Sequence, residues 1–313
     1  MGRKELRRYA PTRGLLWVAG GLAALIAGGC ATQQTRVRPA ANAPAHLLTA
    51  AKEQLVSAYN EQADSIHSVN ASVSMKLTAG TAYSGVIKQY HEIKGFILAR
   101  KPADIRVIGQ APIVGTTIFD MASDGSTFHM YVPSKNTFVE GPANLQRQSA
   151  KAIENLRPQH LVQAIFWNPI PASQPILFAA GDDADARYYI LTVVENASSN
   201  SGPSITEQNG LTDWRIERRI WFDRVDLSVA RVQIYDASGE ITSDIRYADW
   251  HGFGNVRFPE DVVITRPAEG YQLEIRITKM TPNQDIAPDR FEMKQPPGTK
   301  LVQVGEGTEE PQL

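Results

Sequence analysis

The stretch Val69-Asn-Ala-Ser-Val-Ser-Met-Lys-Leu77 decides the fold, because apolar and polar residues alternate along it without interruption. Successive side chains of a β-strand point to opposite faces of the sheet. Strict alternation is therefore typical of a strand with one buried and one exposed face. The stretch predicts a half-buried strand, and with it a sheet that has one apolar side.

Strand-like runs of the same kind recur along the chain at short spacing. They are expected near residues 84–99, 103–110, 114–122, 126–132, 136–140, 187–195, 213–223, 229–237, 240–249, 258–267 and 270–280. Turn sequences such as Ser123-Asp-Gly125 separate them. Short connections make consecutive strands antiparallel neighbours and exclude a parallel α/β fold. The chain is therefore predicted to be mainly β (α+β), with one long sheet curved or closed around a core.

Two helices interrupt this pattern. Apolar residues at near-helical spacing predict a first helix from Leu47 to about Ser65, with Thr49 as its N-cap. A second, short helix is expected over Pro158–Trp167, with proline in its first turn.

The segment Leu161–Gly181 contains no charged residue, which is unusual for a loop exposed to water. We expect it to be buried against the body of the protein, a ligand, a partner or a membrane. An insertion that simply covers the core is the alternative that requires no function.

Residues 1–29 have the pattern of a signal peptide: a basic start, then an uncharged run from Gly14 to Gly29 that is shorter than the roughly 20 residues of a membrane-spanning helix. The sequence Ala27-Gly-Gly-Cys30 follows, with the only cysteine of the chain. It resembles a bacterial lipobox, which implies a diacylglycerol and a palmitate-type acyl chain on Cys30. Two acyl chains hold a protein stably on a membrane. Ala31 after the cysteine implies the outer membrane, on its periplasmic side. The alternative is an uncleaved anchor with an incidental cysteine.

The rest of the chain divides into three parts. Residues 30–46 are mostly small and polar and predict a flexible tether. Residues 47–304 are expected to form the folded domain, and residues 305–313 a disordered tail.

Composition and motifs exclude several classes of function. The chain has 32 Lys and Arg against 33 Asp and Glu, and residues 1–29 hold five of the basic ones. The remainder is acidic on balance, which argues against nucleic-acid binding. One cysteine excludes a disulfide framework, and the six histidines lack metal-ligand spacing. No nucleophile elbow or phosphate-binding glycine loop is present. We therefore expect neither an enzyme nor a bound cofactor or metal.

Three segments carry a resemblance to a known family. They are Lys94-Gly-Phe-Ile-Leu-Ala-Arg-Lys-Pro-Ala-Asp-Ile-Arg106, Ser123-Asp-Gly-Ser-Thr-Phe-His-Met-Tyr-Val-Pro133 and Asp289-Arg-Phe-Glu-Met-Lys-Gln-Pro-Pro-Gly298. In this order they resemble the LolA/LolB superfamily of lipoprotein carriers. The family has a glycine-started strand ending in a basic residue and proline, then a Ser-Asp-Gly hairpin, then a closing Pro-rich turn. The resemblance covers about Leu47 to Val304, and Cys30 makes the chain similar to LolB, which is itself a lipoprotein.

The resemblance implies an open antiparallel β-barrel of about 11 strands, with an N-terminal helix and a short helical lid over an apolar cavity. In this family the cavity accepts acyl chains of lipoproteins. The lining residues are expected to be Val73, Met75, Phe96, Leu98, Ile118, Phe128 and Met130. A packed core would use the same residues.

The resemblance also implies a contact that holds the lid and an apolar segment that enters the membrane. Arg100 and Lys101 stand at the position of the lid contact; two solvated basic residues are the alternative. The lid or membrane-inserting segment is expected to use Phe166, Trp167, Ile170, Ile176, Leu177 and Phe178.

The function expected from these features is that of a lipid-anchored outer-membrane protein. It would face the periplasm and bind acyl chains of lipoproteins or other lipids for lipoprotein sorting or lipid transport. Two alternatives remain: an envelope interaction or sensing module that uses residues 161–181 as a partner interface, and a structural lipoprotein with a filled barrel.

Overall fold

A computed structural model describes residues 47–80, 88–143, 155–181, 187–196 and 214–305. The two described helices are α2 (Lys52–Asp64) and α3 (Pro158–Ile165), and two short 3-10 helices are η1 (Pro133–Lys135) and η5 (Pro288–Phe291). The strands are β1 (Ser68–Ala79), β2 (Lys88–Gln89), β3 (Ile93–Arg100), β4 (Asp104–Gln110), β5 (Thr117–Ser123), β6 (Thr127–Val132), β7 (Thr137–Pro142), β8 (Ile176–Ala180), β9 (Tyr188–Asn196), β10 (Trp214–Asp223), β11 (Val229–Tyr235), β12 (Ile241–Phe253), β13 (Val256–Arg266), β14 (Tyr271–Pro282) and β15 (Lys300–Gln303). The predicted signal peptide, Cys30, the tether and residues 306–313 lie outside the described residues.

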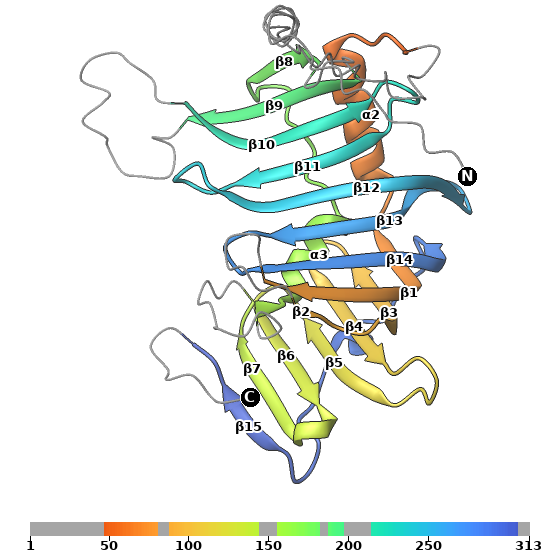
Figure 1. Ribbon diagram of the computed structural model, residues 1–313, viewed down its shortest axis with the longest axis vertical. Coiled ribbons are helices and arrows are strands. Elements are labelled where there is room, and N and C mark those ends of the chain that lie inside the picture. The colour runs from red at the N-terminus through yellow and green to blue at the C-terminus, as the bar shows by residue number, and fades with distance from the viewer. Residues whose placement is uncertain (1–46, 81–87, 144–154, 182–186, 197–213, 306–313) are drawn as a thin grey trace, which may run out of the picture. The chain divides into compact units, whose positions relative to one another are not determined.

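All fifteen strands belong to one sheet, in the order β15-β7-β6-β5-β4-β3-β1-β14-β13-β12-β11-β10-β9-β8, with β2 paired to β1 (Figure 1). Only the β15–β7 pairing is parallel among those of the described strands. β15 and β8 lie at the two ends of this order, so the described strands form an open sheet. The mainly β prediction is confirmed, whereas the expected number of about 11 strands was too low. The four-residue β15 and the exposed β8 lack the alternation by which strands are recognised.

The alternation in β1 is confirmed: Val69, Ala71, Val73, Met75 and Leu77 are all buried. β1 runs beside β14, and Met75 pairs with Ile275. Directly paired residues share a face of the sheet, so the apolar side continues from strand to strand. The opposite side carries cross-strand ion pairs of arginine with aspartate.

Helix α2 lies across the apolar face of the sheet (Figure 1). Its buried residues are Leu55, Tyr59 and Ala63. The helix begins at Lys52, later than predicted, and Thr49 is not its N-cap. The cap residue is Ala51, whose backbone N–H donates to Gln54 Oε1 over 2.8 Å. The second predicted helix is present as α3, with Pro158 in its first turn.

The uncharged segment 161–181 divides into a buried and an exposed half. Trp167 is buried and stacks on Tyr59 of α2, with ring centroids 5.1 Å apart. Its Nε1 donates to the Tyr247 hydroxyl over 3.0 Å, and the Trp250 ring lies edge-on at 6.0 Å. Beyond Pro171 the chain forms β8 at the end of the described sheet.

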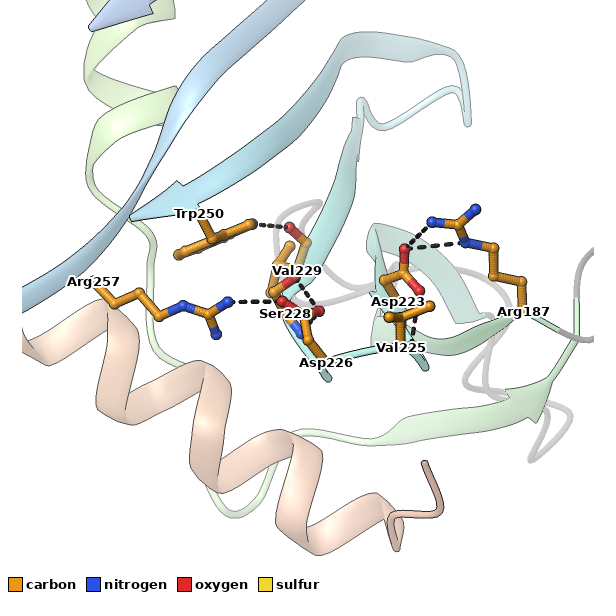
Figure 2. Close-up of polar contacts among 8 residues, drawn as sticks. All are labelled: Arg187, Asp223, Val225, Asp226, Ser228, Val229, Trp250 and Arg257. Carbon is orange, nitrogen blue, oxygen red and sulfur yellow. Dashed lines mark hydrogen bonds and ion pairs between the residues drawn. The ribbon is translucent and has the colours of Figure 1, made fainter. Parts of the chain in front are cut away.

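The turn between β10 and β11 holds the outer member of this aromatic cluster (Figure 2). Trp250 Nε1 donates to the carbonyl of Val229 over 3.1 Å, and Arg257 Nη2 lies 2.7 Å from Asp226 Oδ2. Partial burial raises the pKa of Asp226, but hydrogen bonds from Ser228 and Arg257 outweigh it and lower the pKa below its ordinary value. These contacts tie β11, β12 and β13 together.

Candidate functional site: an apolar cavity beside helix α3

An apolar cavity of about 370 Å³ lies between the sheet and α3. It is lined by Met75, Leu77, Tyr90, His91, Ile93, Val107, Ile118, Phe119, Met121, Met130, Val132, Lys135, Leu156, Leu161 and Leu273. These residues come from β1, β3–β6, β14, the turn before β3, η1, α3 and, in the case of Leu156, the segment just before α3. Only Tyr90, His91 and Lys135 contribute polar groups.

Two glycines make room for side chains that line this cavity. A Cβ placed on Gly109 of β4 would lie 2.4 Å from the ring of Phe119. A Cβ on Gly95 of β3 would lie 2.3 Å from the Cε of Met75. Real Cβ atoms do not approach so closely, so glycine at these two positions lets the larger neighbours occupy the apolar face.

Three of the seven predicted lining residues border the cavity: Met75, Ile118 and Met130. Val73 is buried in the same core but does not line the cavity. Phe128 packs in a separate cluster with Val139 and Val302.

The structure places Phe96 and Leu98 on the other side of β3 from the cavity. In the pairing of β3 with β1, Gly95 is opposite Val73 and Ile97 is opposite Ala71. The inward face of β3 therefore carries Gly95, Ile97 and Ala99, and Phe96 is exposed. Phe96 and Leu98 suggested the opposite face because both are large and apolar, whereas two of the three inward residues, Gly95 and Ala99, are small.

The remaining lining residues were missed for different reasons. Leu77 and Val107 follow the alternation of their strands and could have been found from it. Leu273 could have been found in the same way. Tyr90, His91 and Lys135 lie in turns, where no periodicity marks the direction of a side chain.

Helix α3 is held to the turn between β13 and β14 by a buried polar cluster. His160 Nδ1 lies 2.5 Å from the hydroxyl of Tyr271, and Asn155 Nδ2 donates to the carbonyl of Glu269 over 3.1 Å. Glu269 is itself paired with Arg266, with Oε1 2.5 Å from Nη2. Leu156 follows Asn155 in the chain and Leu161 follows His160, and both leucines line the cavity. The cluster fixes the helix that borders the apolar space.

Burial governs the protonation of this cluster. Desolvation, together with the positive charges of Arg266 and Arg157, lowers the pKa of His160 to about 2. Burial also raises the pKa of the Tyr271 hydroxyl above its ordinary value. At neutral pH the imidazole and the phenol are therefore both uncharged.

Arg100 and Lys101 make different contacts. The Arg100 guanidinium pairs with Asp104, with Nη2 2.6 Å from Oδ2, and donates from Nη1 to the carbonyl of Ile286 over 2.7 Å. Lys101 Nζ donates to the carbonyl of Ala63 at the end of α2 over 2.7 Å and lies 6.0 Å from the Phe166 ring centroid. Lys101 thus reaches the segment after α3, and Arg100 does not.

The residues predicted to form a lid or enter a membrane are separated by the structure. Phe166, Trp167 and Ile170 are buried, and Ile176 is half-buried. Leu177 and Phe178 are exposed on β8. A second exposed apolar pair, Ile113 and Val114, occupies the turn between β4 and β5 and is 97% and 75% exposed.

No described helix has both the length and the apolar content needed to cross a bilayer. No three His, Cys, Asp or Glu side chains in the described part of the chain are grouped so that they could share a metal ion.

No protein-family model matches this sequence, and no curated protein matches it at a significant level. Solved structures with a similar fold include a DUF1329 family protein from Desulfovibrio piger, 14% identical, with a TM-score of 0.46 over 76% of this chain and 95% of that one. A LolA superfamily protein from Nitrosomonas europaea is 12% identical, with a TM-score of 0.46 over 78% and 99%. An outer-membrane lipoprotein-sorting protein domain from Vibrio parahaemolyticus is 11% identical, with a TM-score of 0.43 over 76% and 94%.

Proposed function

We propose that this protein binds an acyl chain of a lipoprotein, or of another lipid, in the cavity beside α3 and takes part in lipoprotein sorting or lipid transport. The single observation that carries the proposal is the cavity, whose lining is apolar except at Tyr90, His91 and Lys135. Its volume of about 370 Å³ lies within the range of small-molecule sites.

The proposed chemistry is non-covalent. Burying a methylene group of an acyl chain contributes about 0.8 kcal/mol, so a chain of ten buried methylenes gains about 8 kcal/mol without any charged anchor. The helix α3 would act as the lid, since Leu161 lines the cavity and His160 holds the helix to Tyr271. Entry of a chain would then require this contact to open.

The proposed location follows from the N-terminal sequence. A diacylglycerol on Cys30 would anchor the chain to the outer membrane, facing the periplasm, with residues 30–46 as its tether. An anchored lipid-binding domain could pass acyl chains between its cavity and the adjacent leaflet.

Introducing a charge into the cavity is expected to abolish acyl binding. Met130 is only partly buried, so Met130→Glu should fold while placing a carboxylate among apolar groups. We expect at least a tenfold loss of affinity for a fluorescent acyl probe, measured with the full chain carrying Cys30→Ser to remove the anchor. The matched control is Met293→Glu, because Met293 is also partly exposed and does not line the cavity. Equal probe binding by both variants would contradict the proposal.

The exposed turn between β4 and β5 is the better candidate for membrane contact than Phe166, Trp167 and Ile170, which are buried. Replacing both Ile113 and Val114 by serine is expected to weaken binding to phosphatidylethanolamine and phosphatidylglycerol vesicles by about tenfold or more, since each apolar side chain gains about 1.5–3 kcal/mol on burial. Co-sedimentation of the Cys30→Ser chain measures the effect. Val225→Ser, in the exposed turn between β10 and β11, should bind like the parent chain; an equal loss in that variant would refute membrane contact through Ile113 and Val114.

One observation favours the alternative function, an envelope interaction module that uses residues 161–181 as a partner interface. β8 is uncharged, lies at the end of the described sheet and exposes Leu177 and Phe178. Exposed strand edges are templates for pairing with another chain. If the full chain takes up no acyl probe at all, this alternative becomes the leading one.

A further inference from the structure

The lining of the cavity carries a single fixed charge, and that charge is positive. Among the lining residues that the structure describes, Lys135 is the only Lys, Arg, Asp or Glu. It lies at the end of η1, in the turn between β6 and β7, and it is exposed. An exposed cation at the border of an apolar space marks where the polar end of an amphiphile would sit.

The Lys135 ammonium has no acidic partner within the described part of the chain. No described carboxylate lies within 4 Å of it, whereas several described arginines are paired. Asp120, on the neighbouring β5, is already paired with Arg106 at 2.8 Å. The ammonium is therefore available to a ligand.

One further cation lies near the cavity. The Nζ of Lys88 lies 5.2 Å from the ring centroid of Tyr90, which lines the cavity. The nearest acidic residue in sequence, Glu92, accepts a hydrogen bond from the hydroxyl of Ser74. Ser74 alternates with the buried Val73 and Met75, so this carboxylate is held on the other face of the sheet.

The volume limits the apolar part of the ligand. At roughly 30 Å³ for each group the size of a water molecule, a cavity of about 370 Å³ holds about a dozen such groups. That matches one acyl chain of about twelve carbons.

We infer that the ligand is a single-chain amphiphile with an anionic head group, its chain in the cavity and its carboxylate or phosphate at Lys135. This inference rests on the proposed function and adds the number of chains and the charge of the head group. An ammonium can donate hydrogen bonds to either anion, and no carboxylate among the described lining residues would repel one.

The test compares amphiphiles of one chain length with the full chain carrying Cys30→Ser. Calorimetric titrations would use dodecanoate, dodecyl phosphate, the neutral dodecyl maltoside and the cationic dodecyltrimethylammonium. We expect the two anions to bind tightest, and Lys135→Gln to weaken their binding about five- to tenfold while leaving the neutral ligand unchanged. The relative affinities of dodecanoate and dodecyl phosphate show which head group the site prefers.

The control variant is Lys279→Gln, because Lys279 is an exposed lysine of β14 that does not line the cavity. Both substitutions are at exposed sites, and thermal unfolding verifies that each variant is folded. Equal affinity for anionic and cationic amphiphiles, or an unchanged anion affinity in Lys135→Gln, would overturn the inference while leaving acyl binding intact. Failure of all four amphiphiles to bind would overturn the proposed function itself.

Discussion

Replacing Trp167 by alanine is expected to lower the free energy of unfolding by about 3–5 kcal/mol, the usual cost of removing a buried aromatic side chain. Trp167 is 6% exposed and stacks on Tyr59 of α2. Its indole N–H donates to the hydroxyl of Tyr247, and alanine would leave that buried hydroxyl with one partner fewer. The substitution therefore creates a cavity and removes a hydrogen bond at the same point.

Denaturant unfolding of the Cys30→Ser chain measures this loss, with Trp214→Ala as the matched control. Trp214 is 54% exposed, so its removal should change the free energy of unfolding by less than about 1 kcal/mol. If Trp167→Ala costs no more than Trp214→Ala, the first half of segment 161–181 is not part of the core. The expected large difference would leave Leu177 and Phe178, and not Trp167, as the surface of that segment.

The elements best predicted from sequence are those whose own pattern determines them. The alternation in β1 gives its buried face directly, and Pro158 gives the start of α3. Antiparallel neighbours followed from the short turns between strands. The lack of charge marks segment 161–181 as unusual. Its division into a buried and an exposed half depends on the tertiary structure, in which Trp167 packs on α2 and β8 lies at the end of the described sheet.

The elements that could not be predicted depend on contacts between distant residues. The inward face of β3 follows from its pairing with β1, in which Gly95 is opposite Val73, and no local pattern encodes that register. The position of Lys135 at the cavity depends on the turn between β6 and β7 meeting β5. The contact between His160 and Tyr271 joins residues 111 positions apart, which neither local sequence indicates.

Because His160 is buried against Tyr271, the protein is expected to lose stability as the pH falls below about 6.5. The ordinary pKa of histidine is about 6.5, whereas burial lowers the pKa of His160 to about 2 in the folded state. Between these values the unfolded state binds a proton that the folded state does not. The free energy of unfolding therefore falls with decreasing pH, by about 2–3 kcal/mol between pH 6.5 and 4.5.

The groups around the imidazole explain why it stays neutral. Arg266 and Arg157 oppose a positive charge, and Glu269, whose Oε1 lies 3.9 Å from Nε2, is already paired with Arg266. Tyr271 remains protonated because burial raises its pKa. Carboxylates with a lowered pKa, such as Asp226, are fully stabilising above about pH 4 and lose that contribution only below it. The interval from pH 5 to 6.5 therefore isolates His160.

His160→Gln should remove most of the pH dependence in this interval, because glutamine does not titrate. Denaturant unfolding at half-unit steps from pH 5 to 7.5 measures the slope. His67→Gln is the control, since His67 is exposed, and it should retain the slope of the parent chain. If the slope persists in His160→Gln, it arises from other titrating groups, and His160 does not link folding to pH in this interval. The expected loss of slope would mean instead that His160 stays neutral in its contact with Tyr271 and takes up its proton only when the protein unfolds.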